Sequence, residues 1–60
     1  MGRQEIRIAT KYGFDRIFCI DVIDGMFCVS ELDPDFGCLT LLGMFETAEE
    51  AKAAIIRECR

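Results

Sequence analysis

The sequence has no histidine and no tryptophan, and it has one serine and one proline among its 60 residues. Without histidine it lacks the commonest general base and the imidazole ligand of most catalytic zinc sites. The five glycines are scattered and form no phosphate-binding loop. The lone serine, Ser30, lies within a predicted strand. We therefore expect a protein that is not an enzyme and that needs no cofactor and no metal ion.

No run of about 18 apolar residues is present, so we expect no transmembrane helix. The N-terminal segment, residues 1–7, lacks the apolar core of a signal peptide, and we expect a cytosolic protein. The four cysteines contain no C-x-x-C pair, which argues against a structural zinc site. Reduced thiols that pack as small apolar side chains are the preferred interpretation, and a disulfide is the alternative. These cysteines are Cys19, Cys28, Cys38 and Cys59.

Charge is unevenly distributed along the chain. Eleven acids and seven bases give a net charge of −4, and residues 21–50 hold eight of the acids and no lysine or arginine. Such a stretch either keeps the surface soluble or meets a basic protein surface, and it repels a phosphate backbone. If it meets a partner, the candidate acidic contacts are Asp21, Asp24, Glu31, Asp33, Asp35, Glu46 and Glu49.

The residue pattern predicts an antiparallel meander. Asp24-Gly25 separates two runs of β-branched and aromatic residues, and this dipeptide favours the type I′ turn of a hairpin. Asp33-Pro34-Asp35-Phe36-Gly37 predicts a second turn, because proline presets φ and glycine supplies positive φ. The strands are expected over residues 4–9, 16–23, 26–32 and 38–45, with the last one broken near Gly43.

A two-residue turn at Asp24-Gly25 also fixes which side chains share a face. The purer apolar face, expected to pack on a helix, carries Phe18, Ile20, Val22, Phe27 and Val29, with Glu31 near its end. The second face is mixed and is expected to be exposed; it carries Ile17, Cys19, Asp21, Ile23, Met26, Cys28, Ser30 and Leu32.

Hydrophobic residues make up 52% of the sequence, more than the core of so small a domain can hold. We therefore expect an exposed apolar patch that binds a partner or a second copy of the chain. The candidate apolar contacts are Ile17, Ile23 and Met26 on the second face, and Phe36 at the tip of the second turn. Phe36 has two interpretations, a lid folded back on the core and an exposed anchor for a partner.

Residues 47–50, Thr-Ala-Glu-Glu, predict a capping box at the start of a helix. The apolar stripe of that helix is mostly alanine, which lets it lie close to a sheet. The expected fold class is α+β, with a three- to four-stranded antiparallel meander and one C-terminal helix packed on one face. A single domain covers residues 1–60, with an N-terminal strand and loop at 1–15, the meander at 16–45 and the helix at 47–59.

Residues 24–55 resemble the DNA-binding domain of plant ethylene-response-factor (APETALA-type) proteins and of their phage-integrase relatives. The resemblance is carried by Asp33-Pro34 between two strands and by the string Leu-Gly-Met-Phe-Glu-Thr-Ala-Glu-Glu-Ala at 42–51. It implies three antiparallel strands with a helix packed across them. That family reads DNA with arginine and tryptophan on its exposed sheet face. The corresponding face of this sequence has neither, so the resemblance concerns the scaffold.

Three functions are compatible with these features. The preferred one is a protein-binding module that engages a basic surface with its apolar face and acidic rim. In size, charge and composition the chain is similar to phage-encoded inhibitors of nucleic-acid-binding proteins, including anti-CRISPR proteins. The second is a DNA-binding module that uses the basic residues near the N-terminus, although a nucleic-acid partner is not favoured. The third is a homodimer with sheet face against sheet face, which is compatible with the first. The basic residues are Arg3, Arg7, Lys11 and Arg16.

Overall fold

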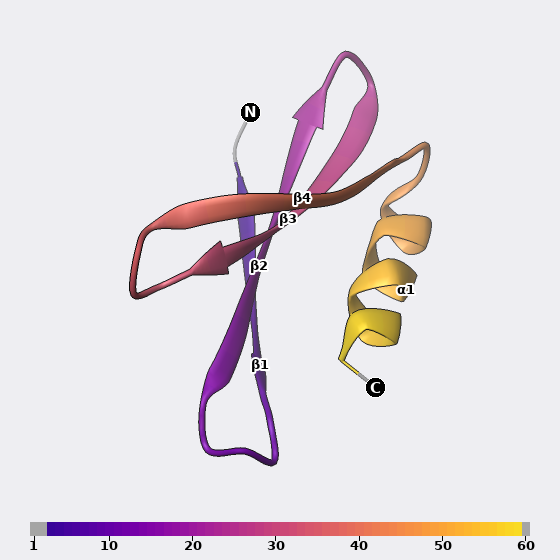
Figure 1. Ribbon diagram of the computed structural model, residues 1–60. Helices are drawn as coiled ribbons and strands as arrows, with labels where there is room; N and C mark the ends of the chain where they lie inside the picture. Colours follow the sequence, from indigo (N-terminus) through magenta and orange to yellow (C-terminus); the bar gives the residue numbers. More distant parts are fainter. Residues whose placement is uncertain (1–2, 60) are drawn as a thin grey trace.

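A computed structural model describes residues 3–59. It contains an open antiparallel sheet of four strands in the order β1-β2-β3-β4, followed by one helix (Figure 1). Each strand therefore pairs with the next one along the chain, which confirms the predicted α+β meander. The elements are β1 (Gln4–Ala9), β2 (Asp15–Ile23), β3 (Met26–Asp33), β4 (Cys38–Phe45) and α1 (Ala48–Glu58).

The β2–β3 hairpin has the predicted turn and register. Asp24 and Gly25 both have positive φ, 52° and 76°, as a type I′ turn requires, and Ile23 lies opposite Met26. In the β3–β4 turn, Gly37 has a φ of 69°, and its N–H donates to the Asp33 carbonyl oxygen at 2.7 Å. Both turns follow from residues that tolerate positive φ at those positions.

The hydrophobic core lies between the sheet and α1. Its fully buried members come from β2, β3 and α1, and the helix contributes Ala51, whose small side chain lets α1 approach the sheet closely. Val22 was expected in this layer but is 59% exposed. It lies on β2 beside the turn, whereas α1 packs mainly on β3 and β4. The buried core residues are Phe18, Ile20, Val29, Ala51 and Ile55.

The start of α1 has the predicted cap in part. Thr47 is extended, with φ −126° and ψ 155°, and its hydroxyl oxygen accepts from the Glu50 N–H at 3.2 Å. The Glu50 carboxylate accepts from the Thr47 hydroxyl at 3.1 Å, and not from the Thr47 N–H as a full capping box requires. Acids in the first turn and Arg57 in the last complement the helix dipole.

A β-bulge interrupts the pairing of β3 with β4. Val29 lies opposite Gly43 and Ser30 lies opposite Leu41, so Leu42 is the extra residue on β4. The bulge turns Leu42 toward the core, where it is half-buried. The sequence pattern predicted a break near Gly43 but not the inserted residue.

Candidate protein-binding surfaces

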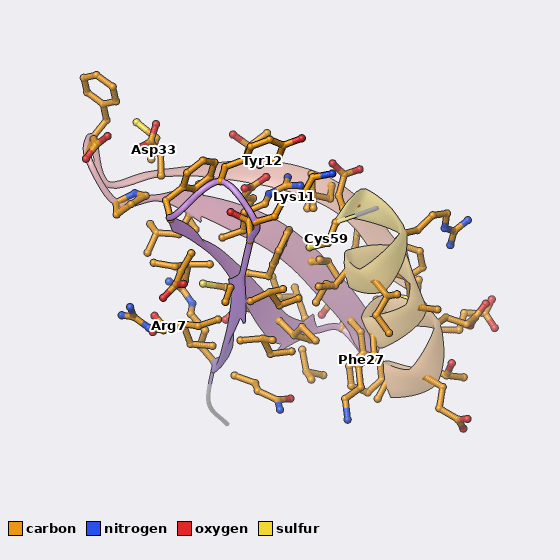
Figure 2. All side chains as sticks on the ribbon, turned by 90° about the horizontal axis from the view of Figure 1, so that it is seen from below. Arg7, Lys11, Tyr12, Phe27, Asp33 and Cys59 are labelled. Atoms are coloured by element: carbon orange, nitrogen blue, oxygen red, sulfur yellow. The ribbon has the colours of Figure 1, made fainter. Side chains whose placement is uncertain are left out.

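The face of the sheet that points away from α1 is called here the uncovered face. Within residues 3–59, no further helix or strand packs on this face, because α1 contacts β3 and β4 from the other side (Figure 1). Figure 2 shows the same division, with Phe27 beside α1 and Arg7 on the side away from it. The strand register places on the uncovered face the apolar residues Ile17, Cys19, Ile23, Met26, Cys28, Leu32, Leu39, Leu41 and Met44.

The centre of the uncovered face is already shielded from water. Ile17, Cys19 and Cys28 are only 5%, 1% and 6% exposed. The expectation that Ile17 is exposed is therefore wrong. In the register Ile17 lies between Arg7 of β1 and Leu32 of β3, so a cross-strand neighbour flanks it on each side.

Around this shielded centre, four large apolar side chains remain open to water. Ile23 is 52% exposed, and on β4 Leu39, Leu41 and Met44 are 43%, 61% and 50% exposed. Met26 is half-buried. Sequence reasoning missed the three residues of β4, although the alternation Leu39-Thr40-Leu41 was a signal for the first two. Met44 was harder to place because the bulge shifts its register.

The β1 edge of the uncovered face carries charges of both signs. Arg3 Nε donates to Asp21 Oδ1 at 3.1 Å, and Arg7 Nε lies 3.6 Å from Glu5 Oε1. The hydrogen bond with Asp21, and then its negative charge, raise the pKa of Arg3 above its ordinary value. Asp21, a candidate partner contact, is therefore engaged within the chain.

On the helix side, Arg16 connects the sheet to the end of α1. Its Nε and Nη2 donate to the two carboxylate oxygens of Glu31 at 2.8 and 2.6 Å, and its Nη1 donates to the Glu58 carbonyl oxygen at 2.8 Å. The guanidinium carbon also lies 5.2 Å from the centre of the Phe18 ring. The hydrogen bonds from Arg16 hold the pKa of Glu31 below its ordinary value, and those to Glu31 raise the pKa of Arg16.

Glu31 was expected to meet a partner, but this bidentate pair already occupies it. Sequence reasoning missed the pair. The signal was present in the hairpin register, because Phe18 lies opposite Glu31 and Arg16 is two residues along the same face.

An open groove of about 470 Å³ lies where the β1–β2 loop approaches the β3–β4 turn. Its lining includes Phe14, Asp15, Asp33 and Asp35, and we call these residues together with Phe36 the acidic end. Phe14 is 59% exposed and Phe36 is 80% exposed. The interpretation of Phe36 as a lid on the core is therefore wrong.

Local interactions stabilise the loop and the turn that form the acidic end. The Asp35 N–H donates to Asp33 Oδ1 at 2.9 Å, which stabilises the turn. The rings of Tyr12 and Phe14 stack with their centres 6.3 Å apart. Lys11 Nζ lies 5.5 Å from the centre of the Tyr12 ring, and Figure 2 shows Lys11, Tyr12 and Asp33 along one side of the molecule.

The remaining candidate acids lie at the other end of the sheet. Asp24 forms the exposed β2–β3 turn, and Glu46 and Glu49 lie where β4 leads into α1. Phe27 pairs with Phe45, which brings these two segments to the same end, whereas Asp33 pairs with Cys38 at the opposite end of the β3–β4 hairpin. The acidic residues are therefore divided between two ends and form no single face.

All four cysteines are free thiols, two of them buried on the uncovered face. Within residues 3–59, no group of three or more histidine, cysteine, aspartate or glutamate side chains could hold a metal ion. The helix in this part of the chain is too short to cross a membrane. No protein-family model, curated protein or solved structure matches the sequence or the fold. The resemblance to ethylene-response-factor domains stays a prediction.

Proposed function

We propose that this chain is a small non-enzymatic protein-binding module whose main binding surface is the uncovered face. One observation carries the proposal: within residues 3–59, Ile23, Leu39, Leu41 and Met44 are about half-exposed around an apolar centre on which no helix or other strand packs. Single exposed apolar residues are ordinary on protein surfaces, but Leu39, Leu41 and Met44 follow one another along β4 on the same face, and such a row indicates an interaction site.

The energetic gain from covering these side chains is substantial for so small a domain. Complete burial of a leucine, isoleucine or methionine side chain contributes about 1.5–3 kcal/mol, so four half-exposed ones together offer roughly 3–6 kcal/mol. A partner would extend the layer formed by Ile17, Cys19 and Cys28, which needs no rearrangement of the sheet. A layer that is already packed before binding fits a preformed binding surface better than one that becomes ordered on binding.

The acidic end supports a second contact, to a protein with a basic surface. Asp15, Asp33 and Asp35 form no ion pair with another residue in the range 3–59, and they lie beside the exposed ring of Phe14. Free carboxylates next to an aromatic ring suit lysine and arginine side chains. An inhibitor of a nucleic-acid-binding protein would use such a surface to occupy the phosphate sites of its target.

A DNA-binding function has less support from the geometry. Of the four bases near the N-terminus, Arg3, Arg7 and Arg16 each lie within 4 Å of a carboxylate of this chain. Binding to a phosphate backbone would require each guanidinium to exchange that partner for a phosphate, which weakens the electrostatic gain. Lys11 is the remaining member of the set.

The test compares two lysine substitutions at apolar residues of similar exposure. Leu41, 61% exposed, lies on the uncovered face, and Ile56, 56% exposed, lies on the outer side of α1. Wild type, Leu41→Lys and Ile56→Lys are each immobilised and incubated with a cell lysate at low and high salt. The proposal predicts a protein that wild type and Ile56→Lys retain at high salt and Leu41→Lys does not. Equal retention by all three variants contradicts it. If no variant retains a protein, the face does not bind a different protein from that lysate.

A further inference from the structure

We infer that the uncovered face binds a second copy of this chain, so that two sheets pack face to face in a two-fold symmetric dimer. This inference rests on the proposed function of the face and names its occupant. Three features of the face favour a second copy over a basic partner: its charge, its area and the construction of the sheet edges.

The first feature is that charge on the uncovered face is nearly balanced. Arg3 is paired with Asp21 and Arg7 lies beside Glu5, and the alternation along β2 adds a third acid, Asp15, at one end of the face. Most of the excess of acids lies elsewhere, on the turns and at the start of α1. Two copies can therefore bring these faces together without opposing like-charged clusters, and a strongly basic partner would find a single excess acid there. The acids away from the face are Asp24, Asp33, Asp35, Glu46, Glu49 and Glu50.

The second feature is the area available. A fully exposed residue of this size presents roughly 200 Å², so the four half-exposed side chains leave about 400 Å² of mostly apolar surface, within the range of roughly 300–600 Å² of the largest patch on a monomer, which is often functional. If a dimer buried these four side chains completely in both copies, about 800 Å² of surface would lose contact with water. The same face also carries half-buried Met26 and Leu32 and the charged residues Glu5 and Arg7 of β1. Their burial would bring the area buried in the dimer toward the roughly 1,200–2,000 Å² of specific interfaces.

The third feature is that both edges of the sheet are poorly suited to pairing with another strand. The β4 edge is uncharged from Cys38 to Phe45, but the bulge at Leu42 interrupts any ladder along it. The β1 edge is short, and its residues Glu5 and Arg7 are charged. Association through the uncovered face is therefore favoured over strand pairing at either edge of the sheet.

The interior of such an interface would contain little unpaired polarity. Ser30 is the one polar residue within the apolar part of the face, and it is already buried. No buried side-chain nitrogen or oxygen within residues 3–59 lacks a hydrogen-bond partner. The apolar part of the face therefore brings few polar atoms into an interface, which favours the close packing of two sheets about 10 Å apart.

Sedimentation equilibrium on the whole chain tests the inference. Wild type and Ile56→Lys are expected to sediment as a species of twice the 6.8 kDa chain mass. Leu41→Lys and Met44→Lys should each raise the dimer dissociation constant at least about thirtyfold, as loss of an interface hot spot does. Circular dichroism checks that each variant keeps the fold of wild type, which the exposure of both residues leads us to expect.

Two outcomes overturn the inference. If wild type is monomeric over the whole concentration range, a second copy is not the occupant of the face. If wild type is dimeric and both Leu41→Lys and Met44→Lys dimerise as strongly, the dimer forms through another surface. Neither outcome decides the proposed function itself. In the capture experiment, a different protein that wild type and Ile56→Lys retain and Leu41→Lys does not would still support that function.

Discussion

Replacing Arg16 should destabilise the domain more than any other change to a charged residue described above. Arg16→Met keeps an unbranched side chain but removes the bidentate pair with Glu31, the hydrogen bond to the Glu58 carbonyl oxygen and the contact of the guanidinium with the Phe18 ring. The Arg16 and Glu31 side chains are 23% and 28% exposed, so solvent screens the pair only partly. Hydrogen bonds to charged groups contribute about 1.5–3 kcal/mol, and allowing for screening we expect a loss of about 2 kcal/mol.

That loss is large for a chain of this length. A 60-residue domain has a free energy of unfolding of roughly 3–9 kcal/mol. A change of 1 kcal/mol shifts the Tm of so small a domain by about 4–8 °C, so Arg16→Met should melt about 8–16 °C below wild type. Urea denaturation followed by circular dichroism measures the same difference as a change in midpoint at constant slope.

A double-mutant cycle assigns the effect to the pair. Glu31→Gln keeps the shape of the side chain and removes its charge, and Arg16→Met with Glu31→Gln should lose less than the sum of the two single changes. A coupling of at least about 1 kcal/mol is expected for side chains in direct contact. Additive effects, or an Arg16→Met variant as stable as wild type, would refute the reasoning.

Three further predictions concern acidity, the helix cap and DNA. Because the pKa of Glu31 is lowered in the folded state from 4.5, its contribution is fully present above pH 4.5 and is lost as the pH falls further. The stability difference between wild type and Glu31→Gln should therefore be constant in denaturation experiments at neutral pH and should shrink below pH 4.5; a difference independent of pH contradicts this. Thr47→Ala should cost about 1 kcal/mol in the same experiments and Thr47→Ser much less, because only the hydroxyl caps α1; equal effects would argue against the cap. Fluorescence anisotropy with duplex DNA should detect no binding at low salt, and salt-sensitive binding would instead support the DNA-binding alternative.

Much of the fold follows from local sequence signals. Asp24-Gly25 fixes a type I′ turn, and that turn determines which residues of β2 and β3 share a face. Thr47 and Glu50 mark the start of α1 for an equally local reason, since the cap satisfies helix N–H groups within one turn. Such features depend on neighbouring residues only, so a single sequence suffices to predict them.

The candidate surfaces depended on contacts that local signals do not specify. The burial of Ile17 requires side chains from β1 and β3, which join it only when the sheet is assembled. The pairing of Arg16 with Glu31 and with the end of α1 connects positions 42 residues apart. Gly43 indicated a break in β4 but not that Leu42 is an inserted residue, and this insertion changes which residues face away from α1.

Methyl NMR spectra of wild type at high and low protein concentration test the central claim most directly. The account predicts concentration-dependent shifts for the methyl groups of Ile23, Leu39, Leu41 and Met44, which lie on the uncovered face. The methyl groups of Val22 and Ile56 are as exposed but lie away from that face, and they should stay unchanged. Shifts confined to Val22 and Ile56, or no shifts anywhere, would contradict the claim that the uncovered face binds a second copy of the chain.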